Sequence, residues 1–233
     1  TYTLSIRAIH SGIGISVLTN TSNSISYGPT VLTPYEGTDD VFVVTGGKNQ
    51  RIWFALTDSK AVLGKPEILR GSTSYATPTS SNVYDGLTYT GRLFSSSAQL
   101  PMVAKAAVTA EDGTAKAYYV LQLADGTYDG TTAYALDLSL SKTELSFSEA
   151  GAFETLTANL RYIGNEEPQI TWESSNSAVA TVNESGVVTA VGSGTAVITA
   201  TCGSQTATCL VTCDFIAEEE QTSSEEALPP ALN

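Results

Sequence analysis

Short segments in which apolar and polar residues alternate recur along the whole chain. The segment SGVVTAVGSGTAVITA, from Ser185 to Ala200, has apolar residues at every second position on both sides of a Gly-Ser-Gly break. Successive side chains of a β-strand point to opposite faces, so this alternation predicts a hairpin with one buried face, in which glycine permits the tight reversal. Because similar segments occur throughout, we expect an all-β protein.

The first 136 residues contain several of these strand-like segments. In TYTLSIRA, at residues 1–8, every second residue is apolar, and a second alternating segment follows Ser11-Gly12, which predicts a β-hairpin. We expect residues 1–136 to form a β-sandwich or a β-barrel-like domain that mediates assembly. The expected strands are Tyr2–Ile9, Gly14–Leu18, Asp40–Val44, Arg51–Leu56, Val103–Thr109 and Ala115–Leu123.

A long segment of this region lacks a clear pattern. Gly71–Ser97 is rich in Gly, Ser and Thr and predicts a long loop, which in a compact domain is usually functional or ordered by a partner. Its tyrosines Tyr75, Tyr84 and Tyr89 are candidate subunit-interface residues, since the ring is apolar and its hydroxyl stays hydrated; stacking on sugars is the alternative. Later tyrosines are expected in strands. Ala98–Ala107 permits one short helix, although its proline and β-branched residue disfavour it.

The chain changes character near Ala135–Asp137, where we expect a domain boundary. From Leu138 it becomes a series of short strands separated by turn residues, at the spacing expected of a β-sandwich. Trp172 is the large residue expected to fill the core of this sandwich. The expected core residues are Trp172, Val182, Val188 and Ile198.

These motifs carry a family resemblance. LSLSKTELSF is followed by ITWESSNSAVATVNESGVVTAVGSGTAVITAT, so that Trp-x-Ser-Ser-Asn, Val-Ala-Thr-Val, Ser-Gly-Val-Val-Thr-Ala and Gly-Thr-Ala-x-Ile-Thr-Ala occur in order. Residues 137–213 thereby closely resemble the bacterial immunoglobulin-like domain of group 2. The resemblance implies an Ig-like β-sandwich, typical of bacterial surface proteins and of phage virion proteins, and it supplies no catalytic residues.

The net charge of −13 is unevenly distributed along the chain. Residues 1–136 carry nine basic and ten acidic residues, residues 137–213 carry two basic and eight acidic ones, and residues 214–233 carry six acidic and no basic residues. This acidity argues against binding of nucleic acid or of anionic membranes through a phosphate-neutralising surface. No run approaches the roughly 20 apolar residues of a membrane-spanning helix, so no membrane insertion is expected. The last segment is expected to be an acidic tail, acting as a spacer or as a peptide that docks on a neighbouring copy.

The three cysteines do not indicate a disulfide framework. Cys209 and Cys213 are too far apart to pair if they lie on one strand, at about 3.3 Å per residue. Gly203-Ser204 is the better turn signal, which disfavours a pair between Cys202 and Cys209. We expect small buried residues in the last strands, and free thiols favour assembly in a reducing cytoplasm.

Residues with catalytic or metal-binding chemistry are few, and we expect neither an enzyme nor a bound cofactor or metal. His10, the single histidine, is expected at a turn or on the surface, and no nucleophile motif accompanies it. Acidic clusters could bind calcium through their oxygens, but they lack the spacing of a calcium loop and are expected to be turn carboxylates. These acids are Glu36, Asp39, Asp40, Asp125 and Asp129.

Two classes of function remain open. The first is a non-enzymatic structural protein of a tailed-phage virion, a tail-tube or capsid-decoration subunit whose partners are its own copies and other virion proteins, assembled in the host cytoplasm. The order of an assembly domain and an Ig-like domain resembles certain phage tail-tube proteins. The second is a bacterial cell-surface or secreted adhesion module with weak binding to host-surface glycans. Thr1 fits removal of an initiator methionine, and trimming of a leader would leave the same start.

Overall fold

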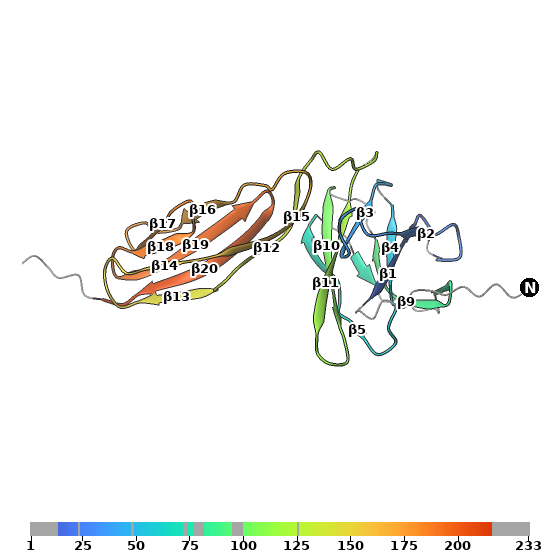
Figure 1. The fold of residues 1–233 in the computed structure, drawn as a ribbon, viewed down its shortest axis with the longest axis horizontal. Helices are drawn as coiled ribbons and strands as arrows, with labels where there is room; N and C mark the ends of the chain where they lie inside the picture. The colour runs from blue at the N-terminus through green and yellow to red at the C-terminus, as the bar shows by residue number, and fades with distance from the viewer. Residues whose placement is uncertain are drawn as a thin grey trace, which may run out of the picture. The chain divides into compact units, whose positions relative to one another are not determined.

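The structure, a computed structural model, describes residues 14–22, 24–47, 49–71, 74–76, 82–94, 100–124 and 126–215. Within these ranges the chain is all-β, which confirms the expected fold class, and no helix that could cross a membrane is present there (Figure 1). The chain divides into two compact units. The first comprises Thr1–Asp137, Arg161–Pro168 and Gly203–Gln205, and the second comprises Leu138–Leu160, Gln169–Cys202 and Thr206–Asn233.

The first unit contains two sheets. A six-stranded sheet has the order β2-β1-β4-β9-β7, with β8 also paired to β9, and all of its pairs are antiparallel. Its strands are β1 (Ile15–Asn20), β2 (Thr30–Leu32), β4 (Arg51–Leu56), β7 (Ser74–Ala76), β8 (Val83–Tyr84) and β9 (Leu87–Phe94). A five-stranded sheet has the order β3-β11-β10-β5, with β6 also paired to β10 and a parallel pair between β3 and β11. Its strands are β3 (Val41–Val44), β5 (Val62–Leu63), β6 (Glu67–Arg70), β10 (Met102–Thr109) and β11 (Ala115–Gln122).

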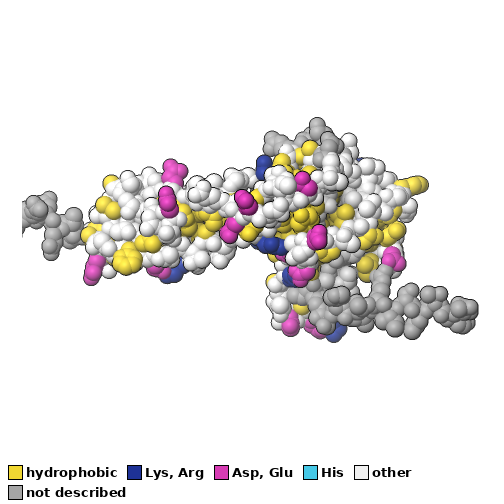
Figure 2. Space-filling model, turned by 45° about the horizontal axis from the view of Figure 1, so that its top comes forward, with side chains coloured by type: hydrophobic (Ala, Val, Ile, Leu, Met, Phe, Trp, Pro, Cys, Tyr) yellow, Lys and Arg dark blue, Asp and Glu magenta, His cyan; other side chains and the backbone are white. Residues whose placement is uncertain are grey.

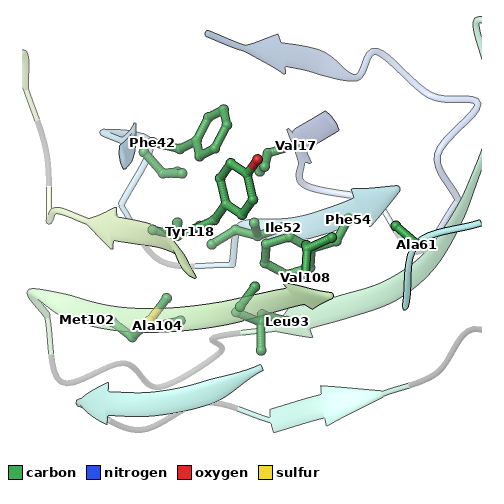
Figure 3. Packing of buried hydrophobic residues seen from close by; sticks show 13 residues of the cluster. Val17, Phe42, Ile52, Phe54, Ala61, Leu93, Met102, Ala104, Val108 and Tyr118 are labelled. Atoms are coloured by element: carbon green, nitrogen blue, oxygen red, sulfur yellow. The ribbon is translucent and has the colours of Figure 1, made fainter. Parts of the chain in front are cut away.

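The main core of the first unit lies between these two sheets. Ile52 and Phe54 of β4 pack in one cluster with Met102 and Val108 of β10 and with Tyr118 of β11. Figure 3 shows these side chains gathered between strands of both sheets. Packing the inner faces of two sheets against each other defines a β-sandwich, one of the two architectures expected for this part of the chain.

Both sheets of the first unit are also covered on their outer faces. Trp53 and Ala55, which alternate with Ile52 and Phe54 on β4, belong to a second buried cluster with Leu18. A third cluster, which includes Val41, Val103, Leu121, Leu136 and Ile163, lies on the outer face of the five-stranded sheet. A strand that is buried on both faces has apolar residues at consecutive positions, and this explains the unbroken apolar run Ile52–Leu56 in β4.

Five of the six strands expected in the first unit are present, with ends that differ by at most two residues. The sixth, Tyr2–Ile9, lies outside the described residues. The long loop expected over Gly71–Ser97 is wrong, because β7, β8 and the eight-residue β9 lie within it. Alternation is broken along β9 because its register with β4 shifts between Phe54 and Ala55, next to Gly91. The alternative of a short helix within Ala98–Ala107, which the proline and the β-branched residue disfavoured, is excluded from residue 102 onward, where β10 begins.

The second unit contains a sheet of order β13-β20-β19-β16 and a sheet of order β14-β18-β17. A separate pair, β12 and β15, has residues in both units. The strands are β12 (Tyr134–Leu140), β13 (Glu144–Phe147), β14 (Phe153–Thr155), β15 (Ala158–Ile163), β16 (Thr171–Ser174), β17 (Ala180–Val182), β18 (Val187–Ala190), β19 (Gly194–Cys202) and β20 (Gln205–Cys213). The core takes side chains from both sheets of this unit. Val188 and Ile198 are completely buried there, and Trp172 and Val182 pack against them as partly buried residues.

The hairpin expected over Ser185–Ala200 is wrong, although both of its strands exist. β18 belongs to the three-stranded sheet and β19 to the four-stranded sheet, so the Gly-Ser-Gly segment carries the chain from one sheet to the other. Gly192 is required there, because a Cβ atom would lie 2.6 Å from the carbonyl oxygen of Ala178. The alternation of apolar residues correctly predicts each strand. It does not predict their pairing, because two strands that face one core from opposite sheets show the same alternation as the two strands of a hairpin.

The three cysteines are buried, and none of them forms a disulfide. Cys202 ends β19, while Cys209 and Cys213 lie on β20. Burial raises the pKa of the Cys209 and Cys213 thiols, which keeps both in the unreactive protonated form at neutral pH.

The packing of the second unit predicts a large difference between two apolar truncations. Ile198→Ala removes a completely buried side chain and should lower the free energy of unfolding by about 2–5 kcal/mol. Phe153→Ala removes a side chain that is 72% exposed and should change it by less than about 0.5 kcal/mol. Calorimetry and urea denaturation of the full chain measure both, and equal losses would contradict the assignment of Ile198 to the core.

Candidate functional site

Charged side chains of the first unit form a network at the outer face of the five-stranded sheet. The Arg161 guanidinium donates two hydrogen bonds to Asp40, one of them from Nε to Oδ2 at 2.9 Å. Lys105 forms an ion pair with Asp137, and the Tyr119 hydroxyl donates to the same Asp137 Oδ2 at 2.9 Å. Asp40 and Asp137 are the acids of this network that could act in catalysis. Asp40 is bound by the Arg161 cation, and Asp137 is bound by the Lys105 cation and the Tyr119 phenol.

The electrostatics of the network follow from these bonds. The hydrogen bonds to Asp40 raise the pKa of Arg161 against the opposing effect of burial. Burial raises the pKa of Tyr119, and its hydrogen bond to the Asp137 carboxylate raises it further, because ionisation would place two negative charges together. The raised pKa values keep the Arg161 guanidinium charged and the Tyr119 phenol protonated over the physiological range of pH, which suits a structural role.

The acidic residues singled out as calcium candidates do not converge. Asp40 binds Arg161, Asp39 accepts from Lys116 at 2.6 Å, and Asp129 accepts from the Thr131 amide at 3.0 Å and from its hydroxyl at 2.7 Å. Across the described part of the chain, no group of three or more His, Cys, Asp or Glu side chains could hold a metal ion. Asp125 and His10 lie outside the described residues, and Glu36 is exposed.

The three candidate interface tyrosines lie on three different strands, β7, β8 and β9. Tyr89 is only 3% exposed, and its hydroxyl lies 2.8 Å from the Ser16 hydroxyl, so the expectation that it is available to a subunit contact is corrected. Burial follows from its place on β9, a strand that sequence reasoning treated as a loop. Tyr84 is half-buried and packs against the cluster on the outer face of the six-stranded sheet, to which Tyr89 also belongs. Tyr75 lies on β7 opposite Leu93.

A different tyrosine cluster lies in the first unit. The Tyr128 ring centroid lies 5.0 Å from that of Tyr35 and 5.8 Å from that of Tyr134. The Tyr128 hydroxyl donates to the Thr132 carbonyl at 2.8 Å, and burial raises the pKa of Tyr128 to about 12. Sequence reasoning missed this group because Tyr35 is distant in the chain from the other two, and only their register and loop geometry bring them together.

One face of the second unit is exposed and uncharged. On the three-stranded sheet, Phe153 lies opposite Thr189, which in turn lies opposite Thr181. The next row pairs Thr155 with Val187. Phe153 is 72% exposed, and its face therefore presents an aromatic ring among hydroxyl groups, a combination suited to weak contact with neutral polar surfaces.

A second exposed apolar feature lies at the edge of the six-stranded sheet. Among the strands that the structure describes, β2 is the last of this sheet, and its Val31 side chain is 53% exposed. Tyr27, three residues before β2, is 72% exposed. On the face that Figure 2 presents, charged side chains are scattered among uncharged and apolar ones. Exposed apolar side chains beside an open strand edge favour contact with another chain.

Comparison with known proteins supports the resemblance for the second unit. Residues 138–211 match the family model of the bacterial Ig-like domain (group 2), which confirms the Ig-like class for this part of the chain. No curated protein matches the chain.

Three solved structures share a low level of similarity with the chain. Domains 4 and 5 of the S-layer protein SbsC are 18% identical over 52% of this chain and 68% of that chain, with a TM-score of 0.31. Mouse clustered PcdhgC3 EC1-3 is 13% identical over 81% and 71%, with a TM-score of 0.29. Domains 1–6 of SbsC are 12% identical over 88% and 29%, with a TM-score of 0.33.

The Asp40 pair predicts a stability difference between two neighbouring acids. Asp40→Asn removes the charge that satisfies Arg161, and since the Asp40 side chain is only 16% exposed, the free energy of unfolding should fall by about 1–3 kcal/mol. Asp39→Asn, at a side chain that is 82% exposed, should cost less than about 1 kcal/mol. Urea denaturation of the two variants measures the difference, and a greater loss in the Asp39 variant would refute the structural role of the network.

The tyrosine cluster predicts an alkaline transition. Because the pKa of Tyr128 is about 12 in the folded chain and about 10 when unfolded, its contribution to stability is complete below pH 10 and is lost as pH rises from 10 to 12. The ultraviolet titration of the native chain, minus that of Tyr128→Phe, should show a phenol with a midpoint near pH 12. In urea the same difference should shift to about 10, and a native midpoint of 10 would contradict the burial of this ring.

Proposed function

We propose that the chain is a non-enzymatic structural protein of a tailed-phage virion, a tail-tube or capsid-decoration subunit whose first unit assembles with other copies and other virion proteins. Its Ig-like domain is carried on the surface of the particle. The observation that carries this proposal is the open edge of the six-stranded sheet, where Val31 and Tyr27 expose apolar surface on a region with nearly balanced charge.

The distribution of charge supports assembly through residues 1–136, the larger part of the first unit. Residues 1–136 have a balance of −1, so copies do not repel one another there, whereas residues 137–213 have a balance of −6. In the latter region both basic residues, Lys142 and Arg161, are already paired with acids. Contacts between copies through this acidic region are disfavoured by like-charge repulsion, which leaves it free for other partners.

The arrangement of polar groups supports a role without catalysis. Lys105, Asp137 and Tyr119 satisfy one another, and Asp40 is held by Arg161. Catalytic acids and bases need free access to a substrate proton, and these groups lack it.

A second candidate function is a cell-surface or secreted adhesion module with weak glycan binding. The uncharged face around Phe153 favours it, since an exposed ring among threonine hydroxyls can stack on a sugar and exchange hydrogen bonds with it.

Particle formation separates the two functions. The full chain should form regular rings, tubes or other oligomers, seen by electron microscopy and by light scattering with a mass several times 24.4 kDa. Phe153→Ala should leave that mass unchanged. A monomer at all accessible concentrations that binds neutral host glycans, and loses this binding in Phe153→Ala, would overturn the virion proposal in favour of adhesion.

A further inference from the structure

Strand β1 has no free edge. It pairs with β2 along one side, with Val17 opposite Leu32, and with β4 along the other, with Val17 opposite Phe54. The alternating segment at residues 1–8 was expected to form a hairpin with β1, but both places beside β1 are taken. A strand formed by this segment therefore needs another edge for its hydrogen bonds.

Strand β2 offers such an edge, and the register identifies its backbone groups. The Gly14 carbonyl accepts from the Thr57 amide at 3.1 Å, so even-numbered residues of β1 bond to β4 and odd-numbered ones bond to β2. The odd-numbered residues Val17 and Thr19 lie opposite Leu32 and Thr30, which therefore bond inward. Val31, between them, directs its N–H and C=O away from β1, and no strand among the described residues pairs with that side of β2.

The side chains at this edge suit an apolar partner strand. Val31 lies opposite Leu18, and Leu18 lies opposite Trp53, so all three share the outer face of the sheet. Leu18 and Trp53 are buried in the outer cluster, whereas Val31 remains 53% exposed at its border. A strand added beside β2 would place alternate side chains next to Val31, and apolar ones would continue this face.

We propose that this edge of β2 binds the N-terminal segment, residues 1–9, of a second copy of the chain. Every second residue from Tyr2 to Ala8 is apolar, as the exposed outer face requires. The segment carries Arg7 and no acidic residue, so no like-charge repulsion opposes its approach to a chain whose net charge is −13. The segment lies outside the described residues, which begin at Gly14 directly before β1. This inference rests on the proposed self-assembly and names the contact that produces it.

Removal of either half of this contact tests the inference in the full chain. A variant without residues 1–9 loses the donor, and Val31→Pro removes the outward N–H of the acceptor. Both should remain monomeric by light scattering under conditions in which the wild-type chain assembles. Val31→Thr keeps the backbone groups and a β-branched side chain, and as the matched control it should still assemble.

A labelled peptide of residues 1–9 provides a direct readout. It should bind the variant without residues 1–9 in a 1:1 ratio by fluorescence anisotropy, and Val31→Pro in that background should weaken binding at least 10-fold. Hydrogen exchange at the Val31 amide should slow when the peptide is bound. This exchange measurement tests the contact even if Val31→Pro does not fold.

The possible outcomes distinguish this inference from the proposed function. Assembly that survives removal of residues 1–9 overturns the N-terminal contact and leaves the virion proposal standing. If removal has no effect but Val31→Pro prevents assembly, β2 pairs with another edge, and the inference is wrong. If the wild-type chain is monomeric but the truncated chain binds the peptide, the segment occupies the β2 edge of its own chain, so the inferred contact between copies is wrong and the virion proposal fails with it.

Discussion

Burial of both faces of the six-stranded sheet is the constraint from which the structure of the first unit follows. On β4, Ile52 and Phe54 point into the core between the sheets, while Trp53 and Ala55 point into the outer cluster. The Trp53 indole can be buried there because its N–H donates to the Asn20 side chain at 3.1 Å. A strand so enclosed must be central, and this places β1 and β4 inside the sheet and leaves β2 at its end.

The charged network has the corresponding role at the five-stranded sheet. Its outer cluster contains Tyr119 and is bordered by Asp137, Lys105 and Arg161, which all find partners. Such pairs add little net stability when they form, but removal of one partner leaves a poorly hydrated charge. Breaking one of these pairs is therefore more costly than its formation is stabilising. Residues 137–213 retain an excess of unpaired acids, because the two basic residues of this range already form ion pairs.

The sequence was sufficient for features that depend on local alternation and insufficient for those that depend on pairing. The fold class, the Ig-like domain and five strands of the first unit could be predicted because each has a two-residue period or a family motif. The strand β9 was missed because the bulge at Gly91 breaks this period. The prediction that β18 and β19 pair as a hairpin was wrong, because the alternation of apolar residues does not determine which sheet a strand joins.

The same distinction explains the candidate surfaces. Tyr89 was a reasonable interface residue only while its segment was taken as a loop, and pairing of β9 with β4 buries it. The side of β2 that no described strand pairs with has no signal in the sequence, because it depends on β1 being paired on both sides. Tyr27 and Val31 could have been noticed only as apolar residues in a polar context, which is common on protein surfaces.

The proposed contact is weak when it is made once. Pro29 and Pro34 bracket β2, and the outward N–H and C=O of Val31 provide about 1–3 kcal/mol in two hydrogen bonds. Donor segment and acceptor edge are different surfaces, so each copy can give one strand and receive one, which generates closed rings or open filaments. In a closed ring every subunit is held twice, and release of one copy requires both contacts to break. A short uncharged edge therefore suits a subunit that remains dispersed when dilute and assembles cooperatively when concentrated.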